Sequence, residues 1–416
     1  MKKIYTLTAA AFCAASALAS APWDGSASSW TEGDGSANSP FIISSPAHLA
    51  YLAEQVNAGT TFEGQFFSLT DDLDMAADAG RKFPVIGLFD TYTDGQTQEN
   101  VDNSLAFMGT LNGNYHTIDN LAVEFFDEEI GGTGFFAVLR TESSICNLIL
   151  GANSTITGDI VTGGFVGQML GGTIQNCANY ATVTGNMFTG GFVGCMEGGK
   201  VSCCVNNGAV LGSTEVGGIA GQGAYNASIE YCYNSAPVTA SGFGGAGIGG
   251  ALYDSFAISH CYNVGAITGN SSPYMGSPHA IVSDMMYSNK VTDCLYVSEL
   301  SGCDDSHATA VTADELGQAD AIAVLNGNTS NFVAAPEGLN NGFPVLAWEA
   351  EVASVRSVFN DNDVNFIVNG RTISSDTTAD VYDFTGRHIA SGQAISLPAG
   401  YYILVINGQA TKLILR

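Results

Sequence analysis

A repeat with a period of about 27 residues constrains this chain more than any other feature. The pentapeptides GGFVG, GGFVG and GGIAG begin at Gly163, Gly190 and Gly217, each 27 residues after the last. A C-x-N triplet travels with them at residues 177–179, 204–206, 232–234 and 261–263. Extra residues enter only at a few segments between these landmarks, which is typical of stacked repeats whose insertions lie in turns.

The residue types in the repeat favour β-structure. The units are rich in Gly, Val, Ile, Thr and Asn and lack a Leu/Ala/Glu/Lys stretch at helical spacing, which excludes a helical solenoid. Short apolar runs between Gly or Asn turns predict a parallel β-helix whose coils stack about 4.8 Å apart. We expect three buried ladders, namely Phe165/Phe192/Ile219/Ile248, Ile174/Val201/Ile229/Ile258 and Val183/Val210/Val238/Ile267. The Asn row is expected at turns, with each amide bonded to the same residue one coil along.

The repeats, written GGFVGQMLGGTIQNCANYATVTG and GGFVGCMEGGKVSCCVNNGAVLG, resemble the GLUG-motif repeats of bacterial surface proteins. The preceding segment, with its helix, LTDDLDM, PVIG and GTLNGNYHTIDNL, is similar to the region that usually precedes such repeats. The resemblance implies a right-handed parallel β-helix that serves as an extracellular stalk or adhesive surface. The family carries no catalytic motif that could be transferred to this chain.

The flanking segments predict an exported, capped protein. Residues 1–21 resemble a signal peptide, with Lys2 and Lys3, an apolar run and the small residues of ALASA. Residues 22–145 would form an N-terminal cap and irregular early coils. The cap would contain a helix from Pro46 to about Asn57 with Ser45 as its N-cap residue. Residues 146–300 would form the repeats and residues 301–350 a second cap, beginning with a helix capped by Thr312.

Residues 351–416 change character and predict a small C-terminal β-sandwich. Alternating strands are separated by NG, TG and PAG turns. The order of Val381-Tyr382-Asp383, Gly386-Arg387 and Leu397-Pro398-Ala399-Gly400-Tyr401-Tyr402 resembles the sorting domain of type IX secretion cargo. The resemblance implies a partner in an export machinery.

Charge narrows the range of partners. The chain has 40 Asp and Glu residues against 12 Lys and Arg residues, so nucleic acid and anionic membranes would be repelled. No run of eighteen apolar residues follows the signal peptide, so no membrane span is expected.

The nine cysteines that follow the signal peptide invite a disulfide interpretation. Cysteines in register on neighbouring coils would have a Cα separation that suits a disulfide. Their parallel Cα–Cβ bonds would not suit its Cβ approach or its dihedral angle. We therefore expect stacked, buried thiols. Cys195 and Cys203, which flank a turn, are the best candidates for a disulfide.

The sequence predicts no catalytic residue, no metal site and no cofactor. Between Thr141 and Val355 only Lys200 and Lys290 are basic, which argues against a polyuronate lyase, whereas a glycosidase needs only two carboxylates. Asp71, Asp72 and Asp74 could bind calcium, but a solvated acidic turn is the preferred interpretation.

These observations predict a non-enzymatic, adhesin-like protein that is secreted or lies on the outer cell surface. Its loops would bind an extracellular glycan or a surface protein. The candidate ligand-binding residues are Tyr225, Tyr253 and Phe256, which lengthen turns that are two glycines in earlier coils. A polysaccharide-degrading glycosidase and a purely structural stalk are the alternatives.

Overall fold

The chain forms two compact units, which divide after Leu346 in the computed structural model. The structure describes residues 23–76, 80–93, 99–126, 132–271, 276–285, 289–358, 366–369, 372–383, 388–397, 400–406 and 409–415. The predicted signal peptide and Gly386, Arg387, Pro398 and Ala399 of the predicted sorting motif lie outside these residues. Each unit is described by itself.

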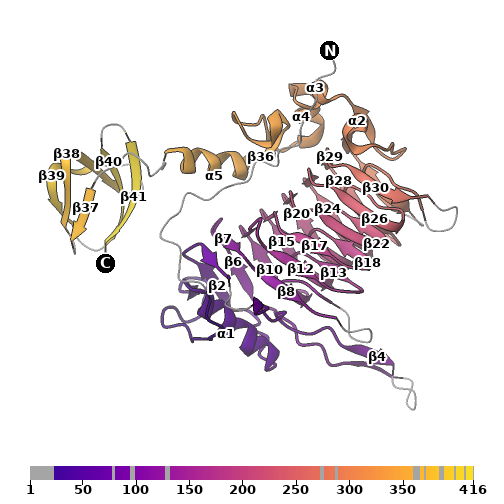
Figure 1. The fold of residues 1–416 in the computed structure, drawn as a ribbon, viewed down its shortest axis with the longest axis horizontal. Helices are drawn as coiled ribbons and strands as arrows, with labels where there is room; N and C mark the ends of the chain where they lie inside the picture. Colours follow the sequence, from indigo (N-terminus) through magenta and orange to yellow (C-terminus); the bar gives the residue numbers. More distant parts are fainter. Residues whose placement is uncertain are drawn as a thin grey trace. The chain divides into compact units, whose positions relative to one another are not determined.

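The first unit is a parallel β-helix whose coils pass through four sheets, here called faces I to IV (Figure 1). Face I consists of β9 (Phe136–Leu139), β14 (Val166–Met169), β19 (Val193–Glu197), β23 (Ala220–Ala224), β27 (Gly249–Leu252) and β31 (Val282–Met285). Face II consists of β1 (Phe41–Ile43), β2 (Phe66–Leu69), β6 (Thr110–Asn112), β10 (Ser144–Cys146), β15 (Thr173–Gln175), β20 (Lys200–Ser202), β24 (Ser228–Glu230), β28 (Ala257–Ser259) and β32 (Lys290–Thr292).

Faces III and IV complete each coil. Face III consists of β3 (Leu73–Asp74), β7 (Thr117–Asp119), β11 (Ile149–Leu150), β16 (Ala178–Asn179), β21 (Val205–Asn206), β25 (Tyr233–Asn234), β29 (Tyr262–Asn263), β33 (Leu295–Val297) and β34 (Thr309–Val311). Face IV consists of β8 (Ala122–Glu124), β12 (Thr155–Thr157), β13 (Thr162–Gly163), β17 (Thr182–Thr184), β18 (Met187–Gly190), β22 (Val210–Gly217), β26 (Val238–Phe243) and β30 (Ile267–Asn270). A short antiparallel hairpin, β4 (Thr91–Thr93) and β5 (Asn100–Asp102), lies outside these sheets.

The predicted ladders are confirmed by the strand register. Ile174 pairs with Val201, and Val183 with Val210, so equivalent residues of successive coils lie side by side. The rings of Phe165 and Phe192 stack with centroids 4.7 Å apart. Burying these apolar rows supplies the main stabilisation of each coil.

Glycine is required in the repeat because backbones approach closely there. A Cβ on Gly190 would lie 2.0 Å from the carbonyl oxygen of Val193, and one on Gly191 would lie 2.6 Å from the Asn206 side-chain oxygen. The second glycine of the motif therefore makes room for the Asn of the same coil. This contact explains why the two sequence landmarks keep a fixed spacing.

A left-handed residue forms the corner between faces II and III. Asn176 has φ 54°, and Cys203, Tyr231 and His260 take the same conformation in later coils. This turn lets both Ile174 and Cys177 point into the core although they are three residues apart.

The Asn row lies in strands of face III, so its predicted placement at turns is wrong. The predicted amide ladder is confirmed, because Asn179 Nδ2 donates to Asn206 Oδ1 and Asn206 Nδ2 to Asn234 Oδ1, both at 2.8 Å. The four side chains are fully buried, at Asn179, Asn206, Asn234 and Asn263. The Asn side chains can lie inside the β-helix because each amide also donates a hydrogen bond to the backbone carbonyl two residues later in the chain.

All nine described cysteines are free thiols, so the alternative pairing of Cys195 with Cys203 is wrong. The row of Cys177, Cys204, Cys232, Cys261 and Cys294 is buried, as predicted. Cys195 instead donates to Gln222 Oε1 at 3.0 Å. Burial raises the pKa of both Cys204 and Cys261 well above the usual range of a thiol, so these groups stay protonated.

The predicted N-terminal helix is confirmed as α1 (Pro46–Asn57). The Ser45 hydroxyl accepts from the backbone N–H of His48 at 3.3 Å, as an N-cap residue should. Its apolar face, which contains Leu49, Leu52 and Val56, is buried in the core of the β-helix.

At the other end of the β-helix the chain forms α2 (Ser298–Ser301), α3 (Ala313–Leu316) and α4 (Ala319–Asn326) (Figure 1). The capping box of Thr312 and Glu315 is confirmed. The sequence predicted one helix here, but the chain breaks at Gly317 and continues as α4.

The segment that follows α4 packs against the side of face III. It contains β35 (Phe332–Val333), a short 3-10 turn (Asn340–Gly342) and β36 (Val345–Leu346). The Tyr262 hydroxyl donates to the Pro344 carbonyl and accepts from Asn340 Nδ2 at 2.7 Å. This segment therefore covers the side of the last coils.

The second unit contains α5 (Ala347–Val358) and one curled antiparallel sheet. Its strands are β37 (Phe366–Asn369), β38 (Thr372–Asp383), β39 (His388–Ser396), β40 (Gly400–Ile406) and β41 (Gln409–Leu415). The long β38 pairs with β37, β39 and β40, which bends the sheet. The unit has its own small core around Val381 and Leu404.

Candidate functional site

The corner between faces I and II carries the predicted aromatic residues. Tyr225 follows β23 with φ 52° and is 62% exposed, while its backbone N–H donates to the Asp254 carbonyl at 2.8 Å. Among the described residues, the large hydrophobic side chains that are exposed are Phe126, Leu211, Tyr225 and Val324. Tyr225 therefore stays a candidate contact residue.

Tyr253 belongs to a polar network on the outer side of face I. Its hydroxyl donates to Glu215 Oε1 at 3.2 Å, and Gln222 Nε2 donates to Glu215 Oε2 at 3.2 Å. Cys195 extends the network through its bond to Gln222. We call Cys195, Glu215, Gln222 and Tyr253 the face I cluster.

Local backbone geometry positions this cluster. Glu215 lies in β22 with φ 53°, just before the GGIAG motif, and a Cβ on Gly250 would lie 2.5 Å from its carbonyl carbon. Glycine at position 250 thus allows the Glu215 backbone to lie against the next coil. Sequence reasoning missed Glu215 because the equivalent positions in the two earlier repeats hold Val161 and Phe188. It missed Gln222 because a polar residue recurs at that position, as Gln168 and Cys195, without a motif that marks a site.

Phe256 is 1% exposed and lies in the core, so its predicted role as a ligand contact is wrong. It directly precedes β28, as Ala227 precedes β24, and both side chains point inward. The ring fills space left by Gly223, where a Cβ would lie 2.3 Å from it. Loop length indicated an insertion here but not the direction of the side chain.

Cys195 acts as a hydrogen-bond donor in this cluster. Burial raises the pKa of its thiol to about 12, and the neighbouring Glu197 carboxylate adds to the shift. A protonated, buried thiol is a poor nucleophile at neutral pH. The cluster therefore consists of fixed donors and acceptors.

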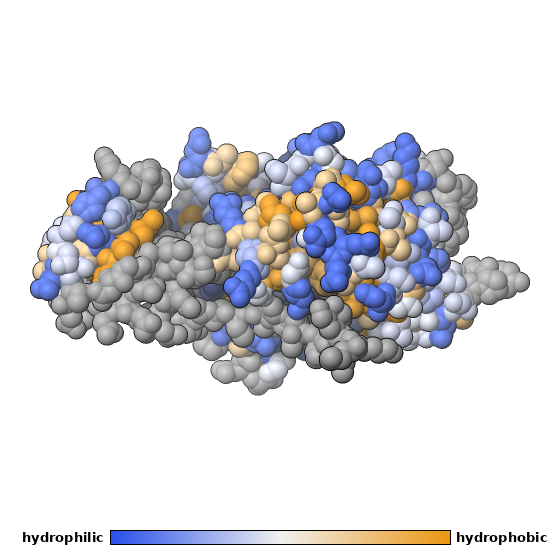
Figure 2. All heavy atoms as spheres, turned by 90° about the horizontal axis from the view of Figure 1, so that it is seen from above, coloured by the Kyte–Doolittle hydropathy of each residue, from blue (hydrophilic) through white to orange (hydrophobic). Residues whose placement is uncertain are grey.

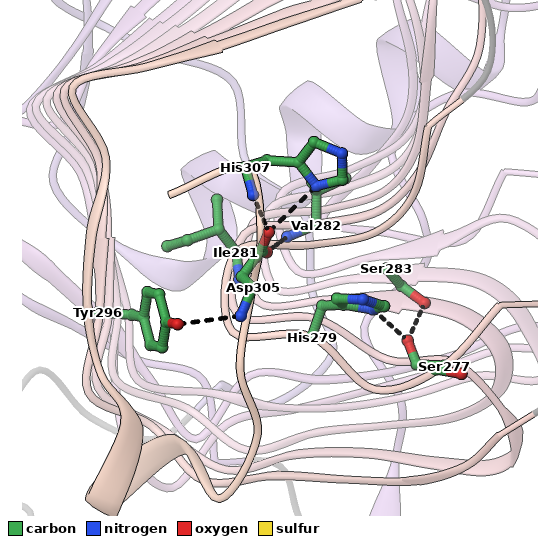
Figure 3. Close-up of polar contacts among 8 residues, drawn as sticks. All are labelled: Ser277, His279, Ile281, Val282, Ser283, Tyr296, Asp305 and His307. Carbon is green, nitrogen blue, oxygen red and sulfur yellow. Dashed lines mark hydrogen bonds and ion pairs between the residues drawn. The ribbon is translucent and has the colours of Figure 1, made fainter. Parts of the chain in front are cut away.

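A second polar network, centred on Asp305, ends the β-helix (Figure 3). In earlier coils one carbonyl accepts two N–H groups of the preceding coil, as the Ile281 carbonyl does from Ile248 and Gly249 at 3.0 Å each. At the last coil Asp305 Oδ2 takes that place and accepts from Ile281 at 2.9 Å and Val282 at 2.8 Å. The carboxylate substitutes for the missing next coil.

The second Asp305 oxygen is also engaged. Oδ1 accepts from the backbone N–H of His307 at 2.8 Å and lies 3.1 Å from its Nδ1 (Figure 3). The Asp305 backbone N–H donates to the Tyr296 hydroxyl at 3.1 Å. Since the carboxyl group is buried and accepts from several donors, its role is structural.

The serines and histidines near this network do not form a nucleophile–base pair. The Ser283 hydroxyl donates to the Ser277 carbonyl at 2.7 Å, and His279 Nδ1 lies 2.7 Å from the same carbonyl (Figure 3). A catalytic serine would need its hydroxyl against a histidine nitrogen.

A Ser/His/Asp group in the second unit also lacks the geometry of a catalytic triad. His388 Nε2 lies 2.7 Å from the Ser391 hydroxyl and 3.4 Å from Asp380 Oδ1. In a triad the carboxylate accepts from the other ring nitrogen, so that the ring is oriented toward the serine. Here both partners face the same nitrogen.

The predicted acidic turn near the N-terminus is largely occupied by protein donors. Asp72 accepts from the Thr117 backbone N–H at 2.8 Å, and Asp74 accepts from Asn120 Nδ2 at 2.8 Å. In the part of the chain that the structure describes, no group of three His, Cys, Asp or Glu side chains could hold a metal ion. These carboxylates secure the first coil to the next one.

Hydrophilic side chains separate the apolar areas of the described surface in the view of Figure 2. None of the helices in the described ranges is long and apolar enough to cross a membrane.

Comparisons with known proteins place the fold. No family model matches the chain. Over 144 residues, 35% of this chain, it is 32% identical to halomucin of Haloquadratum walsbyi (strain DSM 16790 / HBSQ001), but it spans about 1% of that protein's length. The crystal structure of "a putative immunoglobulin A1 protease" from Bacteroides ovatus is similar over 79% of this chain and 98% of its own, with a TM-score of 0.55 and 20% identity. At that identity the likeness shows the fold alone.

Proposed function

We propose that this chain is a secreted or cell-surface protein that binds glycan or protein ligands, as an adhesin does, and that it catalyses no reaction. The observation that carries the proposal is the exposed Tyr225, which directly follows β23, the strand that contributes Gln222 to the face I cluster. Exposed aromatic residues next to fixed polar groups are typical of binding surfaces.

The proposed location rests on the sequence and on one comparison. The signal peptide of residues 1–21 and the resemblance to GLUG repeats favour export, and halomucin is a mucin by its name. We extend the proposal to the second unit, which we take to be a type IX sorting domain that brings the chain to the outer surface.

Two other functions compete with binding. The name of the Bacteroides ovatus protein favours a peptidase, and a β-helix can also carry a glycosidase, which needs two carboxylates across a cleft. Among the described residues neither Ser/His network has triad geometry, which supports the binding proposal over a serine peptidase. A structural stalk is the third candidate.

The test uses the purified chain without residues 1–21. We expect saturable binding to mucin-coated or epithelial surfaces, and no release of reducing sugar or of peptide fragments from polysaccharide or immunoglobulin A1. Turnover of either substrate would overturn the proposal. If the folded protein binds no surface, the result would favour a purely structural stalk.

Export is tested separately in the natural host. Deleting residues 351–416 should leave a folded β-helix that no longer reaches the cell surface. Normal surface display of the shortened chain would contradict the sorting role.

A further inference from the structure

The corner that carries Tyr225 changes shape between neighbouring coils. In the two preceding coils the corner consists of Gly171 and Gly172, then Gly198 and Gly199, all with positive φ. Their backbones stack directly, since a Cβ on Gly199 would lie 2.6 Å from the Gly172 carbonyl oxygen. Tyr225 is the first residue at this corner with a large side chain after two coils that have none.

This change forms a ledge. Gly198 stands at the position of Tyr225 in the preceding coil, so no side chain there covers the ring, which is 62% exposed. We call Tyr225 with the two glycine corners the face I ledge. An exposed aromatic ring beside a corner that carries no side chains is a surface on which a planar ligand ring can stack.

Acceptor groups border the ledge. Glu197 pairs in register with Ala224, so its exposed carboxylate lies one coil away from Tyr225. In the face I cluster, Glu215 accepts from the Tyr253 hydroxyl and from the Gln222 amide. These residues offer a carboxylate, an amide and a phenol, which suit hydroxyl groups as partners.

Charge selects among ligands. Two of the described basic residues adjoin the ledge, and both are paired with carboxylates. Lys200, which directly follows Gly199, pairs with Glu230 at 2.5 Å. Arg140, whose backbone stacks against Gly172, pairs with Asp102 at 2.5 Å. A sulfated or carboxylated sugar would therefore meet carboxylates and only cations that are already paired. Both Glu215 oxygens already accept from neutral donors, so the bidentate edge that an arginine would use is occupied.

From this geometry we infer that the face I ledge binds a neutral, hydroxyl-rich saccharide, whose ring stacks on Tyr225 and whose hydroxyls donate to Glu197. The inference rests on the proposed function and names its ligand class and its site. Glu215 is a positioning residue that fixes Tyr253 and Gln222.

The test measures binding of the chain without residues 1–21 to neutral galactose- and N-acetylglucosamine-containing oligosaccharides and to their sialylated and sulfated forms. We expect the neutral forms to bind. Tyr225→Asn, which tolerates the positive φ, should weaken binding about tenfold, the upper end for one aromatic contact. Tyr225→Trp should retain binding, and Glu197→Gln should weaken it about threefold, as expected for one weakened hydrogen bond.

Matched controls lie elsewhere on the same unit. Glu63 is an exposed glutamate between α1 and β2, and Phe126 is 60% exposed. Glu63→Gln and Phe126→Ala should bind like the unchanged chain. Circular dichroism and thermal melting of each variant show whether a lost signal reflects misfolding.

The outcomes separate the inference from the proposed function. Wild-type affinity in folded Tyr225→Asn would overturn the site, and preference for sialylated or sulfated sugars or for a Lys-rich peptide would overturn the ligand class. In both cases surface binding would stand. Absence of any saccharide binding by a chain that still binds cell surfaces would also refute the inference alone, whereas failure to bind surfaces would refute both.

Discussion

Replacing Asn206 with Ala should destabilise the β-helix more than any exposed substitution. Its amide donates to Gly208 O at 2.9 Å and to Asn234 Oδ1 at 2.8 Å, and its oxygen accepts from Asn179 at 2.8 Å. The substitution removes these three bonds and leaves their partners buried. At about 1–3 kcal/mol for each orphaned group, less what relaxation recovers, we expect a loss of about 3–5 kcal/mol.

The assay is urea unfolding of residues 22–346, followed by far-ultraviolet circular dichroism. Asn186 is the matched control, since it is exposed and Asn186→Ala should change the free energy of unfolding by less than about 0.5 kcal/mol. A loss below about 1 kcal/mol for Asn206→Ala at an unchanged m-value would refute the view that the buried amide column stabilises the fold.

Three further predictions concern other parts of the chain. Asp305→Ala should speed hydrogen exchange at the Ile281 and Val282 amides, whereas Asp305→Asn, which keeps one acceptor, should do so less; equal exchange in both variants and the unchanged chain would rule out the end-capping role. Burial raises the pKa of Cys146 and Cys303 to about 11, so above about pH 8.5 the folded chain holds protons that the unfolded chain loses, and the free energy of unfolding should fall from there toward pH 11; a free energy of unfolding that stays constant over this range would contradict the burial of these thiols. Deleting residues 347–416 should leave the melting of the β-helix unchanged, because the chain divides after Leu346; a large drop in its melting temperature would contradict this.

Much of the fold could be predicted from spacing because every coil repeats the same contacts. Ile174 and Val183 keep their distances from Cys177, so the register of faces II and IV followed directly from the sequence. The helix at Pro46 followed from its N-cap serine and one apolar face. These features depend only on local sequence and on the regular stacking of one coil on the next along the axis of the β-helix.

The direction of side chains at corners could not be predicted in this way. A period of three between Ile174 and Cys177 conflicts with a strand, and only the left-handed turn at Asn176 resolves it. Phe256 and Tyr225 both lengthen a corner, yet one fills space above Gly223 and the other is exposed. Whether such a side chain is buried or exposed depends on the residue beside it in the neighbouring coil.

The site needed contacts between coils that the sequence does not mark. Glu215 approaches Tyr253 across 38 residues, and no motif relates the two. Asp305 likewise has no counterpart in the repeats, because it replaces a peptide group and not a side chain.

The end cap has a consequence for how such a chain can change over evolutionary time. Asp305 accepts from two backbone N–H groups of the last coil, and the four coils before it each present the same pair to one acceptor. Whole coils could therefore be gained or lost by unequal recombination between the related repeats without any change in the residue that terminates them. The length of the rod, and with it the reach of its side surfaces, can vary among descendants of one gene while both ends stay the same.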